Sequence, residues 1–106
     1  MKITTLILII SLLFLGCGIK REDCEKNQTG EVVFNNNSQS GKTYDIIWDG
    51  VMIATVEPSK ESKVFTYAAN VPHKLVFRIT NTKTNACTES TPILNQCQEN
   101  TFSCSE

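Results

Sequence analysis

The sequence predicts an all-β fold, a single antiparallel sandwich of about seven short strands that follows an N-terminal signal peptide. Three observations support this prediction. Apolar and polar residues alternate with a period of two through most of the chain after residue 29, and turn-forming residues recur at roughly the 8- to 12-residue spacing of short strands. Beyond the leader no stretch has helical periodicity, while 10 Thr favour strands and 9 Asn suit turns.

The first sixteen residues have the features of a signal peptide. Lys2 supplies a positive charge, and Ile3 to Leu15 is an apolar run interrupted only by two Thr and one Ser. A spanning helix needs about 20 apolar residues, whereas this run stops at Gly16 with charged residues close behind. We therefore expect residues 1–16 to be a removable leader, with a retained membrane anchor as the alternative.

The residues at the end of the leader resemble a bacterial lipobox. In Phe14-Leu15-Gly16-Cys17 the small Gly16 precedes the cysteine as the pattern requires, although the two residues before it differ from the usual Leu followed by Ala or Ser. The resemblance implies that Cys17 carries acyl chains such as palmitate and becomes the new N-terminus. Two or three chains hold a protein at a membrane almost permanently, and Gly18 after the cysteine favours the outer membrane. The alternative is cleavage after Gly18 and release of a soluble protein.

Residues 17–29 are predicted to be a lipidated tether. Six of the twelve residues from Gly18 to Thr29 are charged, and Ile19 is the only bulky aliphatic residue there. Such a composition cannot bury enough apolar surface to fold alone. The folded domain is therefore expected to cover residues 30–106.

Seven segments with strand-like alternation make up this domain. The clearest local signal is Asp49-Gly50, whose residues suit the positive φ angles of a type I′ hairpin turn. Before it, Tyr44, Ile46 and Trp48 alternate with other residues, which places Trp48 in the core; an exposed ring that stacks on sugar or protein is the alternative. The predicted strands cover residues 30–35, 44–48, 51–56, 63–68, 74–80, 88–94 and 101–105. Seven short strands with regular turns are typical of an immunoglobulin-like sandwich.

Charge and cysteine content narrow the function. Lys plus Arg number 10 and Asp plus Glu 11, so without Lys2 the balance is 9 against 11, or −2, and no basic stripe for nucleic acid is present. Five cysteines in 106 residues indicate an oxidising compartment. If Cys17 is acylated, an even set of four remains, which allows three disulfide pairings.

A longer resemblance includes the hairpin. The segment from Tyr44 to Pro58, followed by a Ser-rich turn, Phe65 and His73, resembles a PEGA-type module, and the arrangement with Cys24 ahead of the first strand resembles small Bacteroidetes lipoproteins. The resemblance implies a surface or cell-envelope binding domain without catalytic residues. It also implies a disulfide between Cys24 and Cys97, which leaves Cys87 for Cys104. A rival arrangement joins Cys87 with Cys97 and Cys24 with Cys104.

The sequence offers little for catalysis or for metal binding. Nine residues separate Cys87 from Cys97 and six separate Cys97 from Cys104, so the paired Cys-x-x-Cys of a zinc or redox site is missing. His73, the only histidine, follows Pro72 and is expected to be a solvated residue at a strand start. A pair of carboxylates for glycoside chemistry could be imagined among Asp45, Asp49 and Glu57. Asp49 is explained by the turn and Asp45 by the outer face of a half-buried strand.

These observations predict a non-enzymatic, lipid-anchored lipoprotein of the outer membrane, without a cofactor or a bound metal. Its domain is expected to bind protein or glycan at the cell surface, with the loops 35–43 and 81–85 as candidate contact sites. The alternative is a soluble, secreted, disulfide-stapled binding or inhibitor module. The sequons at Asn27 and Asn36 would matter only in a eukaryotic host.

Overall fold

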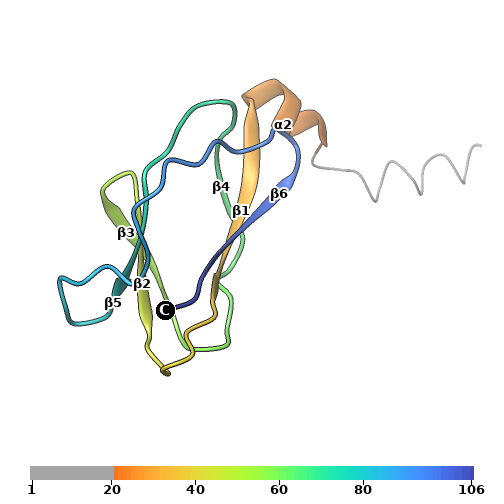
Figure 1. Cartoon of the computed structure of the whole chain (residues 1–106). Coiled ribbons are helices and arrows are strands. Elements are labelled where there is room, and N and C mark those ends of the chain that lie inside the picture. Colours follow the sequence, from red (N-terminus) through yellow and green to blue (C-terminus); the bar gives the residue numbers. More distant parts are fainter. Residues whose placement is uncertain (1–20) are drawn as a thin grey trace, which may run out of the picture.

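The computed structural model describes residues 21–106, so the predicted signal peptide and the predicted lipidation site at Cys17 lie outside the described residues. Within this part of the chain, two three-stranded sheets face each other (Figure 1). The predicted all-β sandwich is therefore confirmed. Its elements are α2 (Arg21–Asn27), β1 (Thr29–Asn36), β2 (Tyr44–Trp48), β3 (Val51–Val56), β4 (Phe65–Ala68), β5 (Leu75–Ile79) and β6 (Glu99–Cys104).

One strand pairing differs from the antiparallel prediction. The sheets have the orders β4-β1-β6 and β3-β2-β5, and every pair is antiparallel except β1 with β6, which is parallel. The reason lies in the segment before β6. Cys97 N donates to Thr29 O at 3.0 Å, and Cys97 is disulfide-bonded to Cys24, so β6 starts beside the start of β1. Two strands that start at the same end run in the same direction.

The described residues contain six strands rather than seven. The predicted strand 88–94 forms only isolated bridges, such as Leu75 with Ser90 and Pro72 with Ile93. Pro92 lies in this segment, and proline has no N–H to donate to a regular ladder. The segment nevertheless lies along β5, because Leu75 and Ser90 exchange both backbone hydrogen bonds at 2.8 and 3.0 Å.

The predicted tether differs from the structure over residues 21–29. Helix α2 occupies most of this segment, β1 begins at Thr29, and Cys24 lies within the helix. The prediction that no helix follows the leader was therefore wrong. A seven-residue helix is too short to be stable alone, but the disulfide fastens it to the sandwich. Gln28, with φ of 54°, ends the helix in the left-handed conformation usual after a last turn.

The core lies between the two sheets, and Phe34 is at its centre. The Phe34 ring packs edge to face against Trp48 at 5.6 Å and Phe77 at 6.2 Å between centroids. Trp48 is buried, as predicted, and the hairpin prediction is also confirmed because Asp49 and Gly50 have φ of 51° and 82°. The buried cluster contains Val32, Phe34, Tyr44, Ile46, Trp48, Val56, Leu75, Phe77, Leu94 and Cys104.

Candidate functional site

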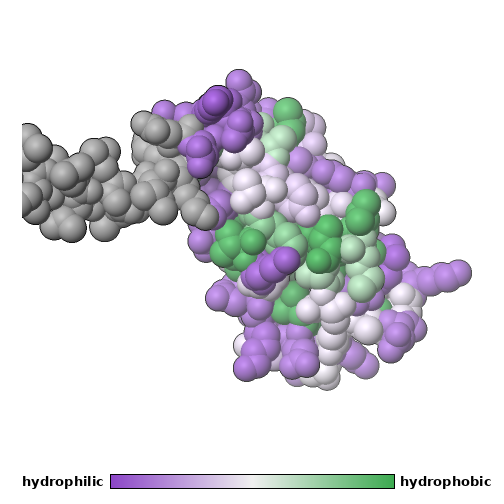
Figure 2. All heavy atoms as spheres, turned by 180° about the vertical axis from the view of Figure 1, so that it is seen from behind, coloured by the Kyte–Doolittle hydropathy of each residue, from purple (hydrophilic) through white to green (hydrophobic). Residues whose placement is uncertain are grey.

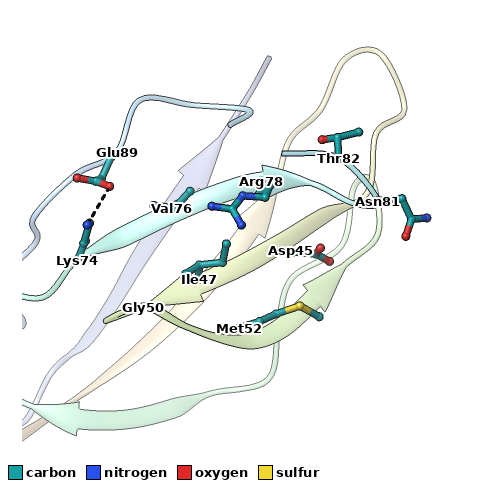
Figure 3. Close-up of a pocket in the computed structure, with 10 residues that line it drawn as sticks. All are labelled: Asp45, Ile47, Gly50, Met52, Lys74, Val76, Arg78, Asn81, Thr82 and Glu89. Atoms are coloured by element: carbon teal, nitrogen blue, oxygen red, sulfur yellow. Dashed lines mark ion pairs between the residues drawn. The ribbon is translucent and has the colours of Figure 1, made fainter. Parts of the chain in front are cut away.

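A groove crosses the outer face of the β3-β2-β5 sheet, on the side turned away from the core (Figure 3). Its volume is about 500 Å³, within the range of roughly 300–1,000 Å³ that is common for ligand sites. The groove is lined by Asp45, Ile47, Gly50, Met52, Lys74, Val76, Arg78, Asn81, Thr82 and Glu89.

The floor of the groove contains an apolar row that crosses all three strands. In the strand register Ile47 lies opposite Met52 on β3 and opposite Val76 on β5. Alternate residues of neighbouring strands share a face, so these three side chains are adjacent. Met52 is 59% exposed, which leaves this end of the row open to solvent.

A polar row lies beside the apolar one. Asp45 is opposite Thr55 on β3 and Arg78 on β5. The Asp45 carboxylate does not pair with Arg78: its Oδ1 accepts hydrogen bonds from Thr55 Oγ1 at 3.0 Å and from Thr80 Oγ1 at 2.9 Å. Two neutral hydroxyls therefore hold this carboxylate in place on the sheet.

Arg78 consequently lies in the groove without a counter-charge among the described residues. The ion pairs in that part of the chain are His73 with Asp49 and Lys74 with Glu89. The Arg78 Nε atom is also buried and has no hydrogen-bond partner there. A buried donor without a partner costs about 1–3 kcal/mol, so an acceptor that reached it would be bound favourably.

The rim of the groove holds a second cation that is already paired. Lys74 Nζ lies 3.5 Å from Glu89 Oε1, as the dashed line in Figure 3 marks. Both side chains are about half exposed, and a pair of this kind contributes at most about 1 kcal/mol. Arg78 is therefore the principal uncompensated positive charge of the groove.

His73 is placed differently from the sequence prediction. It is buried rather than solvated, and its ring stacks on Trp48 with centroids 4.7 Å apart. Its Nδ1 lies 2.7 Å from Asp49 Oδ2, and its Nε2 lies 2.7 Å from Ala68 O. Both neighbours are acceptors, so the ring satisfies both contacts only when both nitrogens carry hydrogen. These contacts link the β2-β3 turn to β4.

The charge of Asp49 is stabilised by the same contacts. Partial burial acts to raise the pKa of Asp49, but hydrogen bonds from His73 and from Lys74 N, together with the charge on His73, hold that pKa below its ordinary value of 3.8. Burial and the nearby Asp49 charge raise the pKa of Tyr67, whose ring stacks on Trp48. Among the described residues the lining of the groove includes neither His73 nor Asp49, and their contacts hold the β2-β3 turn against β4.

The four cysteines of the described domain form two disulfide bonds. The bonds are Cys24–Cys97, with Cα atoms 5.3 Å apart, and Cys87–Cys104, with Cα atoms 6.0 Å apart. The pairing implied by the family resemblance is the one that forms, and the rival pairing does not. The first bond fastens helix α2 to the residues just before β6. The second fastens the 80–98 segment to Cys104, the last residue of β6.

The two candidate contact loops have different roles. Asn81 and Thr82 line the groove, whereas the loop 35–43 is absent from its lining. Asn36 is fully buried, and its Nδ2 donates to Lys42 O at 2.7 Å and to Val56 O at 2.8 Å. In the folded domain the Asn36 side chain is therefore used to close the loop.

Sequence reasoning missed the residues that form the groove. Ile47, Met52, Val76 and Arg78 were assigned to predicted strands but not to a site. A signal was present, because Ile47 and Val76 are aliphatic at positions that point away from the core. Alternation shows which face each residue is on, but it does not show that these residues share one row.

Over the described residues, no group of His, Cys, Asp or Glu could hold a metal ion, and no helix is long and apolar enough to cross a membrane. Comparison of the chain with protein-family models gives no match, and comparison with curated proteins gives none either.

Proposed function

We propose that this chain is a non-enzymatic lipoprotein of the cell envelope, anchored in the outer membrane through Cys17, whose sandwich is a surface binding module. The observation that carries the proposal is the use of the cysteines. The sequence has five, and the two disulfides use the four of the domain. Cys17, which ends the lipobox-like segment, is the one that neither bond uses.

The domain itself supports export and a binding role. Two disulfides in fewer than ninety described residues are typical of a protein that folds in an oxidising compartment. The sandwich is the architecture that the PEGA-like resemblance implies. The groove offers an apolar floor and a free cation, which suit a binding site, and no nucleophile paired with a general base lines it.

The test is the chemistry of the mature N-terminus. Cells that express the full chain are grown with an alkyne analogue of palmitate, and the purified protein is analysed by click labelling and intact mass. We expect label on the wild type, loss of the first sixteen residues and a mass increase for two or three acyl chains. Cys17→Ser should abolish the label and release the domain from membranes, because a chain without acyl groups has no anchor.

A matched control keeps the test specific. Gly18→Ser changes the neighbouring residue without removing the thiol, so it should still be labelled. An unlabelled wild type with a free N-terminus after Gly18 would instead identify a soluble secreted module, and a wild type that keeps its leader would contradict both forms of the proposal.

A further inference from the structure

We propose that the groove binds a segment of a partner protein in which an acidic and an aliphatic residue are two positions apart. The carboxylate would bind the guanidinium of Arg78, and the aliphatic side chain would lie on the apolar row of Met52, Ile47 and Val76. This inference rests on the proposed function only in taking the groove as the binding surface, and it is independent of the lipid.

The charge of the ligand follows from Arg78. Its guanidinium has no ion pair among the described residues, and its buried Nε has no hydrogen-bond partner there. Guanidinium binds carboxylates in a planar, bidentate manner. Asp45 and Glu89 in the same lining repel any anion, and they repel a doubly charged phosphate about twice as strongly as a singly charged carboxylate.

The spacing within the ligand follows from β5. Val76 and Arg78 are two residues apart on one strand and both line the groove, so their Cα atoms are separated by about 7 Å. In an extended peptide the side chains of residues two apart also lie on one face at about that spacing. A strand-like peptide laid along β5 can therefore place its acid on Arg78 and its aliphatic side chain over the apolar row. Because Val76 is only 5% exposed, this aliphatic contact falls mainly on Met52, which is 59% exposed.

Other features of the groove favour a peptide over a glycan. Among residues 21–106 no aromatic ring lines it, and Trp48, the ring best suited to stacking on sugar, is 2% exposed in the core. Asn81 and Thr82 supply polar groups that can bond to a peptide backbone. The exposed Met52 is an unbranched side chain that adapts to different apolar shapes.

Figure 2 shows the face opposite to the view of Figure 1, where apolar residues form a band across the described domain. The large apolar side chains exposed in the structure are Val51, Met52, Val64, Val71 and Ile93. Of these only Met52 lines the groove.

The experiment is a titration followed by nuclear magnetic resonance. The protein without residues 1–16, carrying Cys17→Ser, retains both disulfides and the entire described core, and it is labelled with ¹⁵N. The probes are the pentapeptides Ac-Thr-Glu-Thr-Leu-Thr-NH₂ and Ac-Thr-Leu-Thr-Glu-Thr-NH₂, which present the acid and the aliphatic residue in both orders. We expect at least one to bind with a dissociation constant of about 1 mM or less and to shift amide signals of the groove strands.

Variants assign the contacts. Arg78→Gln should weaken binding about tenfold or more, since it removes the charge but keeps a side chain on the outer face. Met52→Gln should weaken it less and leave the fold intact, because this side chain is mostly exposed. Lys26→Gln, which removes a cation from α2 outside the groove lining, should have no effect. Replacing Glu by Gln in the peptide should reproduce the loss seen with Arg78→Gln.

Several results would overturn the inference. They are saturable binding that Arg78→Gln leaves unchanged, equal binding of the Gln peptide, signal shifts confined to residues outside the groove, or no saturable binding of either acidic peptide. Octanoate is tested in parallel, and its binding without that of the peptides would assign the groove to a lipid acid instead. Each of these outcomes leaves the labelling of Cys17 unaffected, so the two proposals fail separately.

Discussion

Replacing Asp49 by Asn isolates the contact that links the β2-β3 turn to the rest of the sandwich. Asn tolerates the positive φ of 51° at this position, and its carbonyl oxygen can still accept the hydrogen bond from Lys74 N at 2.9 Å. What is lost is the carboxylate oxygen 2.7 Å from His73 Nδ1. Asp49→Asn therefore removes one charge-assisted bond and leaves the turn.

The expected decrease in the free energy of unfolding follows from the geometry of the Asp49–His73 contact and from the exposure of the Asp49 side chain. A hydrogen bond to a charged group contributes about 1.5–3 kcal/mol. The Asp49 side chain is 48% exposed, so solvent screening reduces this contribution to about 1–2 kcal/mol in the free energy of unfolding. In a domain of this size that loss lowers the melting temperature by about 5–10 °C.

The assay is urea unfolding followed by fluorescence. Trp48 is the only tryptophan and is buried beside the contact, so its emission reports unfolding of the region concerned. Asp45→Asn, on the neighbouring strand β2, is the matched control. Its Oδ1 accepts only from two hydroxyls, which an Asn oxygen can also do, so the change should be below about 0.5 kcal/mol.

The contribution of Asp49 to the free energy of unfolding should depend on pH in a definite direction. Because the folded pKa of Asp49 is lowered, its contribution is present above the unfolded value of about 3.9 and is lost as pH falls through the folded value. The difference between wild type and Asp49→Asn should therefore shrink as pH falls below about pH 4. Equal stabilities at neutral pH, or a difference that persists in acid, would refute the reasoning.

Two further predictions concern the region where β1 and β6 lie beside the segment that precedes β6. Gly30→Ala should lower the free energy of unfolding by about 1–3 kcal/mol, because the new Cβ would lie 2.5 Å from the backbone oxygen of Asn95. The control is the exposed substitution Thr101→Ala, and an effect of Gly30→Ala no larger than that of the control would contradict the prediction. Replacing Cys24 and Cys97 together by Ser should lower the free energy of unfolding by about 4 kcal/mol, because the disulfide closes a separation of 73 residues. Calorimetry of the wild type and the double variant measures this difference, and a decrease below about 1 kcal/mol would count against the prediction.

Much of the fold was predictable because its determinants are local. Alternation with a period of two gave the bounds of the strands at 44–48 and 51–56 without error, and Asp49-Gly50 predicted the turn between them. The helix was missed because its seven residues show no apolar face, and its disulfide to Cys97 is what holds it in place.

The candidate site was predictable only in part. The loop 81–85 was singled out, and two of its residues line the groove. The loop 35–43 was singled out as well, but Asn36 binds it to the sandwich. The free charge of Arg78 was invisible in the sequence, because it depends on Asp45 turning to two threonines rather than to the arginine opposite.

The sequence by itself determined which residues alternate into the core, where the hairpin turns and how many cysteines are available to form crosslinks. Only the tertiary structure decided that β6 runs parallel to β1, that His73 is buried on Trp48, and that Arg78 has no counter-charge in the described domain. The physical reason is the distance along the chain between the residues that interact. Alternation and turn conformation are set by neighbours along the chain, whereas strand direction, burial of a turn residue and charge pairing depend on residues that lie far away in the sequence.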